Sequence, residues 1–404
     1  MRVLITNLFL AKNSGSEVVV ELLADGLRRA GHQPMILAPT LGPQAARMRT
    51  RGHIIVDRAA GVPATPDIIH AQHTPVALAA MAAFPQTPAV FACHSASFEM
   101  EAPRPHPQIT RWIAVDDLCR DRCLSRGVPA DRLTVILNAV DLERFARRPA
   151  LPAKPRRALL LTKNLGHAAA IRAACVSQGV ELVELGPATG RISDAIENEL
   201  PNYDLVFATA RMALEAAAVG CAVIVCDARG FAGYLTAERL DAWRQLNFGA
   251  GLLSRPTTEQ LVAEAISAYD AHDAAIVTDR LRQEASFTDS IAQHLAVYEA
   301  ALADPRPTPG EVAAGTASWI ENLVPMSRGG DWEVIAREKH GFESEATALA
   351  LAESEHRIGL EVARLTGKNA QRIIRELGER IAEANRPASV GSDIPPAQPS
   401  PDKA

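Results

Sequence analysis

Several features that mark other protein classes are scarce or missing in this 404-residue chain. Aromatic residues make up only 4% of it, which argues against a platform that stacks nucleic-acid bases. The formal net charge is -5, and a chain without a basic excess is not expected to bind nucleic acid by neutralising phosphates. No apolar run reaches the roughly 18 residues of a membrane span, so no spanning helix is expected.

The amino terminus and the cysteines point to an intracellular setting. MRVLITNLFL lacks the order of basic segment, apolar core and small-residue cleavage site that marks a secretory signal, so we expect a cytoplasmic protein. No further ligands accompany the cysteines at short spacing, so a metal site is not expected. We interpret them as reduced, small apolar residues: Cys93, Cys119, Cys123, Cys175, Cys221 and Cys226.

The patterning that is present is that of a globular α/β protein. Hydrophobic residues are 48% and charged residues 22%, as in ordinary soluble domains. Short apolar runs alternate with helical patterns, which predicts doubly wound parallel sheets with helices on both faces. The predicted strands are Val3–Thr6, Met35–Leu37, Ile54–Val56, Asp67–His70, Ala89–Cys93, Ile113–Val115, Thr134–Leu137, Ala158–Thr162, Val180–Leu185, Asp204–Thr209, Ala222–Cys226 and Gly251–Leu253. The predicted helices are Glu17–Ala30, His167–Gln178, Arg211–Val219, Thr258–His272 and Ser286–Ala303.

The alternation breaks twice, and the breaks suggest domain boundaries. RRPALPAKPRR, residues 147–157, is rich in Pro and basic residues and suits an extended linker. We therefore predict a Rossmann-like domain at 1–146 and another at 158–303, with a cleft between the carboxyl ends of their strands. DPRPTPG then starts a helical extension at 304–385, and the Pro/Ser-rich residues 386–404 are expected to be disordered.

The extension carries an apolar stripe on a charged helical pattern between residues 345 and 384. Three roles are open for it: self-association with another copy, packing on the body of the protein, and peripheral contact with a membrane surface. Its many acids weaken attraction to anionic lipid, so we favour a partner helix.

The most informative stretch is ARMALEAAAVGCAVIVCDARG, residues 210–230. It predicts a small-residue helix, a Gly turn, a buried strand and a loop. Glu215, an acid among alanines, can accept two hydrogen bonds from a vicinal diol such as a ribose. Arg211 and Arg229 can neutralise phosphate oxygens. The alternative is that Glu215 only stabilises the start of its helix through the helix dipole.

Three further loops follow predicted strands, where open α/β sheets bind ligands. Gly15 and Ser16 form a small-residue turn at a helix start, which favours an anion; a simple capped turn is the alternative. His94 can hydrogen-bond a hydroxyl, although a lone His is more often structural. Lys163 is a further cation, or a surface lysine.

Two other kinds of site are not indicated. Neither GxGxxG nor GxxxxGK[ST] occurs, so the sequence does not suggest a nicotinamide site or a P-loop. His70 and His73 have HxxH spacing, but they lie at a strand end without a third ligand, so we expect no metal there.

Taken together, several segments resemble the retaining family 4 glycosyltransferases of the GT-B architecture. They occur in the family's order across residues 1–303. They are NSGSE (13–17), similar to its glycine-rich first loop; DIIHAQH (67–73) and FACHS (91–95), similar to its acceptor-side strand ends; DRLTVILNAVDLERF (131–145), similar to the strand that ends in Asn-Gly-Val-Asp, with Ala139 in place of the Gly; and SFTDSIAQHLAVYEAAL (286–302), similar to its closing helix.

The resemblance implies transfer of a sugar from a nucleotide-sugar donor to a glycan or lipid-linked acceptor, with retention and without a metal or other cofactor. Glu215 matches the second of the family's paired acids, which binds the nucleotide ribose. The first acid, which contacts the donor sugar, falls at Phe207 and is absent. Lys163 and Arg211 would then face the diphosphate, and His94 a sugar hydroxyl.

The resemblance and the composition together suggest synthesis of a bacterial surface polysaccharide, in the cytoplasm or at the inner face of the membrane. Two alternatives remain open. The absence of an acid at Phe207 and the appended extension suit a degenerate transferase that binds nucleotide or glycan as a scaffold. A nucleotide-sugar epimerase of the same architecture is the third reading.

Overall fold

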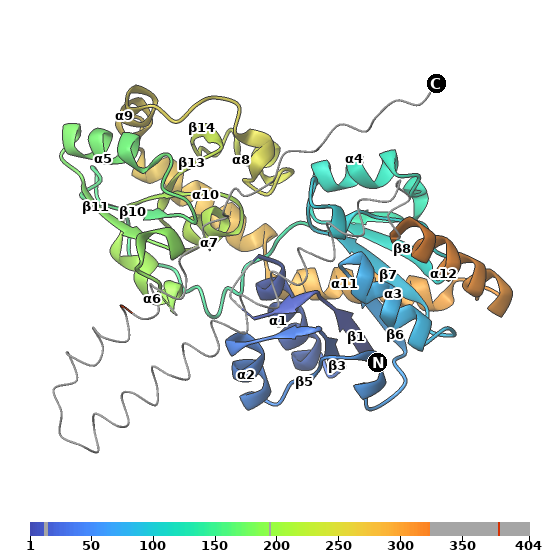
Figure 1. Cartoon of the computed structure of the whole chain (residues 1–404). Helices are drawn as coiled ribbons and strands as arrows, with labels where there is room; N and C mark the ends of the chain where they lie inside the picture. The colour runs from blue at the N-terminus through green and yellow to red at the C-terminus, as the bar shows by residue number, and fades with distance from the viewer. Residues whose placement is uncertain (12–14, 194, 324–378, 380–404) are drawn as a thin grey trace, which may run out of the picture. The chain divides into compact units, whose positions relative to one another are not determined.

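The computed structural model describes residues 1–11, 15–193, 195–323 and 379. The chain divides into two compact units, Met1–Ile320 and Glu321–Ala404, and both major sheets belong to the first (Figure 1). The predicted helix at 345–384 and the predicted tail from 386 lie outside the described residues, except for Glu379. In the part of the chain that the structure describes, no helix is long and apolar enough to cross a bilayer.

The first sheet contains seven parallel strands in the order β5-β3-β1-β6-β7-β8-β9. Its central strands are buried on both faces, which explains their continuous apolar sequences. The order reverses between β1 and β6, which places a crevice at their carboxyl ends. The strands are β1 (Arg2–Thr6), β3 (Gln33–Leu37), β5 (Ile54–Val56), β6 (Ile68–Ala71), β7 (Ala89–Cys93), β8 (Ile109–Ala114) and β9 (Leu133–Val135), and β2 (Phe9–Leu10) pairs separately with β4 (Thr40–Leu41).

The second sheet has the order β11-β10-β12-β13-β14, and it is parallel except for the edge strand β14. Its order reverses between β10 and β12, so a second crevice lies at the carboxyl ends of those two strands. The strands are β10 (Arg157–Leu161), β11 (Glu181–Leu185), β12 (Leu205–Ala208), β13 (Ala222–Asp227) and β14 (Gly230–Tyr234). We call residues 1–146 the N-terminal half and residues 158–286 the C-terminal half.

Helices connect the strands and cover the sheets (Figure 1). This confirms the predicted α/β class with two Rossmann-like sheets. The helices are α1 (Gly15–Arg29), α2 (Pro43–Thr50), α3 (Thr74–Ala83), α4 (Asp117–Ser125), α5 (Ala168–Ser177), α6 (Ile196–Glu199), α7 (Ala210–Val219), α8 (Leu240–Arg244), α9 (Glu259–Ser267), α10 (Ala271–Glu284), α11 (Phe287–Ala303) and α12 (Pro309–Leu323).

The helix α11 packs on the N-terminal half, although the sequence suggested that it closes the C-terminal domain at residue 303. Ile291, Val297 and Tyr298 are buried in one core with the first sheet. Gly26 of α1 permits the contact, because a Cβ there would lie 2.5 Å from the Ile291 side chain. The chain therefore crosses back to the first sheet after α10.

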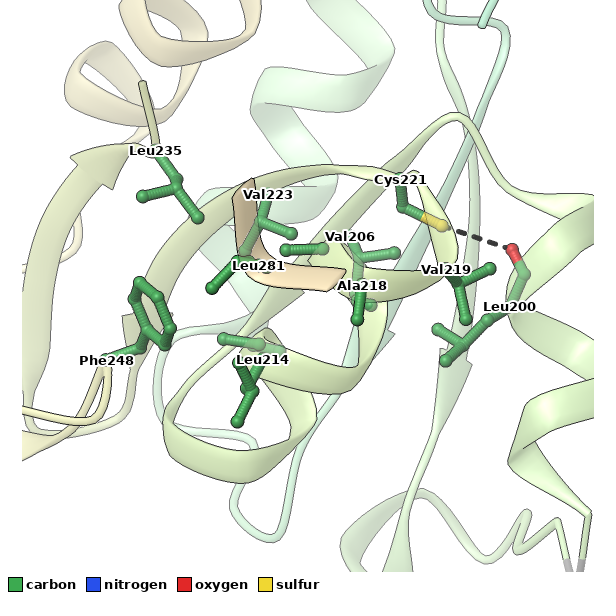
Figure 2. Packing of buried hydrophobic residues seen from close by; sticks show 14 of the residues in the cluster. Leu200, Val206, Leu214, Ala218, Val219, Cys221, Val223, Leu235, Phe248 and Leu281 are labelled. Atoms are coloured by element: carbon green, nitrogen blue, oxygen red, sulfur yellow. Dashed lines mark hydrogen bonds between the residues drawn. The ribbon is translucent and has the colours of Figure 1, made fainter. Parts of the chain in front are cut away.

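One core of the C-terminal half lies between its sheet and the helices α7 and α10. Figure 2 shows Val206, Leu214 and Leu281 packed together there, and the Cys221 thiol donates a hydrogen bond of 3.3 Å to the Leu200 carbonyl oxygen. All six cysteines are buried and unpaired, which confirms the prediction that they act as small apolar residues.

Three local predictions were wrong. Gly251–Leu253 is not a strand, because it overlaps a 3-10 turn at Ala250–Leu252 held by bonds such as Leu252 N–H to the Gly249 oxygen. The single helix predicted at Thr258–His272 is two helices, since Asp270 caps the start of α10. The loop predicted around Gly230 begins the antiparallel strand β14.

A buried polar cluster joins the two halves. The Asn247 side-chain amide donates to the Val115 carbonyl oxygen, and its Oδ1 accepts from the Asn138 N–H at 3.0 Å and from Arg244 at 2.7 Å. Arg244 also donates to the Asn138 oxygen. Asn247 is 3% exposed and has a left-handed backbone, φ 49°, a conformation that Asn tolerates better than most residues.

We expect Asn247→Ala to lower the free energy of unfolding by about 2–3 kcal/mol, because it leaves buried backbone and guanidinium groups without partners. Chemical denaturation would measure this loss, with Gln260→Ala on the exposed face of α9 as the control. Equal loss in both variants would contradict a special role for the Asn247 cluster.

Candidate functional site

Of the residues predicted to bind a nucleotide, Lys163, Arg211 and Arg229 follow strands of the second sheet and Glu215 lies on α7, whereas Gly15 and Ser16 lie at the start of α1 in the N-terminal half. Thr209 alone separates β12 from α7. Ala210 begins the helix with φ 52°, and its N–H donates 2.8 Å to the Phe248 oxygen. The N–H groups of the first helical turn are therefore placed directly at the strand edge, where they favour an anion.

Glu215 is paired with Arg211 on the same helix. Arg211 Nε lies 3.6 Å from Glu215 Oε1, and the two side chains are 18% and 13% exposed. Burial raises the pKa of the Glu215 carboxyl, whereas the charges of Arg211 and Arg144 lower it. The acid is thus placed among cations rather than isolated among alanines. The structure brings Arg211 and Glu215 together, as the prediction of one site requires.

Phe207 is a core residue and does not lie where a site acid could reach a ligand. It lies inside β12, is fully buried, and belongs to the core with Leu160 and Ile224. The family spacing of the paired acids puts the first acid at this position, inside the strand, and the connection that follows β12 is one residue long. An acid eight positions before Glu215 would therefore point into the core.

The other two predicted cations of this half differ in their surroundings. Lys163 is exposed, in a tight turn after β10 in which Thr162 Oγ1 donates 2.6 Å to the Asn164 oxygen. Arg229 is 63% exposed and bound to Asp227, Nη2 to Oδ2 2.5 Å. Lys163 and α7 flank the reversal between β10 and β12. Arg229 belongs to the turn between β13 and β14, and its charge is already countered by Asp227.

Gly15 and Ser16 begin α1, as predicted, although residues 12–14 of their loop are outside the described part. Gly15 is exposed, and a Cβ there would meet nothing within 4 Å. Glu17 is buried in the first turn and accepts a 2.6 Å bond from the Ala11 N–H. This carboxylate already lies at the helix start that was predicted to receive an anion.

His94 follows β7 and belongs to a group of histidines in the N-terminal half. Burial lowers its pKa, opposed first by the Glu101 charge. Burial also lowers the pKa of His70 well below the ordinary value, and His294 and His94 add to that effect. His70 Nδ1 is hydrogen-bonded to the Tyr298 hydroxyl at 2.8 Å. No hydrogen bond or ion pair among the described residues joins His94 to Arg211 or Glu215, so its catalytic role stays a prediction.

Both ring nitrogens of His73 have hydrogen-bond partners within the N-terminal half. His73 has a left-handed backbone, φ 58°, as the residue before α3, a strained conformation of a kind that clusters at functional sites. Its Nδ1 accepts 2.9 Å from the Leu8 N–H, and its Nε2 contacts Glu101 Oε1 at 3.0 Å. Among the described residues, no group of three or more His, Cys, Asp or Glu is placed to hold a metal ion.

Sequence reasoning missed Glu101 and the polar atoms around it. Glu101 lies in a short turn without a recognisable motif, and only folding brings it to His73. At the carboxyl ends of β1, β6 and β7 or next to them, several buried polar atoms have no partner among the described residues. They are Asn7 Oδ1, His70 Nε2, Gln72 Oε1, Gln72 Nε2, His94 Nε2 and Glu101 Oε2. Such atoms are costly to bury unless a ligand engages them.

Two pockets lie away from these residues. One of about 330 Å³ is lined by Arg244, Gln245 and Glu284, next to the Asn247 cluster. The other, about 430 Å³, is lined by linker residues and α10. Neither pocket is lined by a predicted site residue. The candidate site is therefore described from the carboxyl ends of the strands and not from a pocket.

Comparisons with known proteins bear on part of the chain and on its fold. The Glycosyltransferase Family 4 model matches residues 13–144, within the N-terminal half. No curated protein matches the chain.

Several solved structures share the fold at low sequence identity. HepE of Anabaena in complex with UDP aligns with a TM-score of 0.57 and 15% identity, over 74% of this chain and 100% of its own. HepE with UDP and glucose gives 0.54 and 16%, over 73% and 99%. The lipopolysaccharide outer core galactosyltransferase WaaB gives 0.51 and 10%, over 74% and 99%. The chain therefore has the GT-B fold that the resemblance implied.

We expect Phe207→Glu, which restores an acid at the family spacing, to lower the free energy of unfolding by at least about 4 kcal/mol. The change removes a buried ring and buries a carboxylate. Thermal or urea unfolding would measure it, and Val176→Glu at an 81% exposed position is the control. A stable Phe207→Glu protein with new activity would contradict our placement of Phe207.

Proposed function

We propose that the chain is a glycosyltransferase that moves a sugar from a nucleotide-sugar donor to a glycan or lipid-linked acceptor. The observation that carries the proposal is the Arg211–Glu215 pair at the start of α7, beside the strand reversal of the second sheet. A mostly buried carboxylate flanked by cations suits the two hydroxyls of a ribose next to a diphosphate.

The remaining groups of the C-terminal half suit a leaving nucleoside diphosphate. Lys163 follows β10 and Arg211 follows β12, on either side of the reversal. The N–H groups of α7 add positive potential. These groups would stabilise the negative charge that develops as the bond between the sugar C1 and the phosphate oxygen breaks. Arg229 would contribute only if phosphate displaced Asp227.

We propose that transfer proceeds with retention and without a metal. In this reaction the acceptor oxygen attacks C1 from the face that the phosphate leaves, and the departing phosphate takes the acceptor proton. The family resemblance and the cationic strand edge support this course. His94 would hold a sugar hydroxyl, while Gly15 and Ser16 would lie beside the diphosphate at the start of α1.

The setting we propose is synthesis of a bacterial surface polysaccharide, in the cytoplasm or at the inner face of the membrane. It rests on the family resemblance and on the composition. HepE was solved with UDP and with UDP-glucose, which makes UDP the first nucleotide probe and UDP-glucose the first donor probe for this chain.

We expect Glu215→Gln to reduce the affinity for the best-bound nucleoside diphosphate at least tenfold, because an amide cannot accept both ribose hydroxyls. A panel including UDP and UDP-glucose would be read by thermal shift; ligand at 100 times Kd stabilises the wild type by about 2.7 kcal/mol. Glu181→Gln, at an exposed position on β11, is the control. Undiminished nucleotide stabilisation would mean that Glu215 only pairs with Arg211.

A second function, a nucleotide-binding scaffold without activity, is favoured by the absence of an acid in the one-residue connection before α7. A measurement of turnover distinguishes an active glycosyltransferase from an inactive scaffold. We expect the full chain to release nucleoside diphosphate from at least one donor and to join the sugar to an added acceptor, as measured by mass spectrometry. Tight nucleotide binding without turnover across donors and acceptors would establish the scaffold. Conversion of the donor sugar without an acceptor would reveal an epimerase.

A further inference from the structure

A cavity of about 430 Å³ lies at the amino ends of strands in the second sheet. It is lined by residues 147–151 of the linker, by Gly220 and by the side of α10 that includes Thr278. The linker leads into β10 and Gly220 leads into β13. Lys163 and Arg211 follow the carboxyl ends of their strands, so this cavity is separate from the proposed nucleotide site.

The lining of the cavity is cationic and otherwise mostly apolar. Arg147 and Arg148 contribute to it from the linker, whereas no Asp or Glu of the described residues lines it. Pro149, Leu151 and Ala275 supply apolar surface. A pocket of this composition suits a small molecule that carries one anionic group and one apolar group.

Arg148 is held at the wall of the cavity by its neighbours. Its backbone N–H donates 2.8 Å to the Val219 oxygen at the end of α7. A Cβ at Gly220, where φ is 110°, would lie 3.1 Å from Arg148 Cγ, so the absence of a side chain there leaves room for the arginine stem. The Arg148 side chain is 9% exposed, and its Nη2 donates 3.1 Å to Asp204 Oδ1.

Most donors of this guanidinium are not used by the protein. Arg148 Nε and Nη1 are buried without a hydrogen-bond partner among the described residues. The second oxygen of Asp204 is already engaged, because Oδ2 accepts from the Arg156 N–H at 2.9 Å and from the Arg157 N–H at 3.3 Å. Buried donors without an acceptor are costly. A turn of the guanidinium toward the cavity would expose them and break one bond, while Asp204 would keep its two backbone donors.

Arg147 provides a second cation that an anion can reach. It pairs with Asp279, but the two side chains are 48% and 52% exposed. An ion pair so open to solvent contributes little free energy. Arg147 can therefore exchange Asp279 for a bound anion at small cost.

We propose that this cavity binds a phosphate monoester with a compact apolar group. The phosphate oxygens accept from Nε and Nη1 of Arg148 and from Arg147, while the apolar group lies against Pro149 and Leu151. A phosphate monoester carries a charge of about -1.5 to -2 at neutral pH, which matches two arginines better than a carboxylate does. The site uses no residue of the proposed transfer reaction, so it does not depend on the proposed function.

Titration calorimetry on the full chain tests the ligand class. The probes are phenyl phosphate, inorganic phosphate, benzoate and phenol, each with and without UDP. We expect phenyl phosphate to bind at least tenfold more tightly than the other three, because it alone combines a doubly charged group with an apolar ring. UDP should change its affinity less than twofold, since the cavity and the proposed nucleotide site lie at opposite edges of the sheet.

Arg148→Lys tests the residue that the proposal depends on. Lysine keeps a cation beside Asp204 but has no guanidinium fork, so we expect at least a tenfold loss of affinity for phenyl phosphate. Arg172→Lys is the matched control, because Arg172 on α5 makes a two-bond pair with Glu184 and does not line the cavity. Its affinity for phenyl phosphate should change less than twofold. Thermal unfolding without ligand checks that both variants fold.

Three results would each overturn the site: no binding of phenyl phosphate or no preference for it over the other probes, equal affinity in the wild type and Arg148→Lys, or displacement of phenyl phosphate by UDP. If Arg148→Lys does not fold, Arg147→Gln at the exposed position takes its place, with at least a threefold loss expected and an unchanged affinity contradicting the proposal. Failure of UDP to bind would count against the transferase proposal and leave this site intact.

Discussion

The direct passage from β12 into α7 is the constraint on which the C-terminal half depends. With Thr209 alone between them, the helix begins at the carboxyl edge of the sheet, and the Ala210 N–H is fixed by the Phe248 oxygen. The same passage puts Arg211 in the first turn of the helix, and Glu215 pairs with it one turn further along. It also leaves no loop in which an acid could stand eight residues before Glu215, so the residue at that spacing is the core residue Phe207.

The N-terminal half complements this arrangement with polar atoms instead of cations. His73 holds a backbone conformation that costs on the order of 1–3 kcal/mol, and the ring it positions orients Glu101. Packing alone requires neither the left-handed backbone of His73 nor the orientation of the Glu101 carboxylate. The first sheet thus has buried polar atoms without partners near the reversal between β1 and β6 among the described residues, while Lys163 and Arg211 follow the two strands at the reversal of the second sheet.

The strands were predictable because buried parallel strands are continuous apolar runs, and Ile54–Val56 and Ala89–Cys93 coincide with β5 and β7. Glu215 and Arg211 were predictable from a single helical segment, since neighbours four apart share a helix face. Glu101 was not, because its partner His73 lies 28 residues away and no pattern connects them. Arg229 was predicted to meet phosphate, and its pairing with Asp227, two residues before it, was not predicted from the sequence.

The most direct test of the central claim is a crystal structure of the full chain with UDP. We expect the ribose hydroxyls to lie within hydrogen-bond distance of the Glu215 carboxylate, with the diphosphate at the start of α7 between Arg211 and Lys163. A nucleotide bound elsewhere, with Glu215 still paired only to Arg211, would contradict this claim.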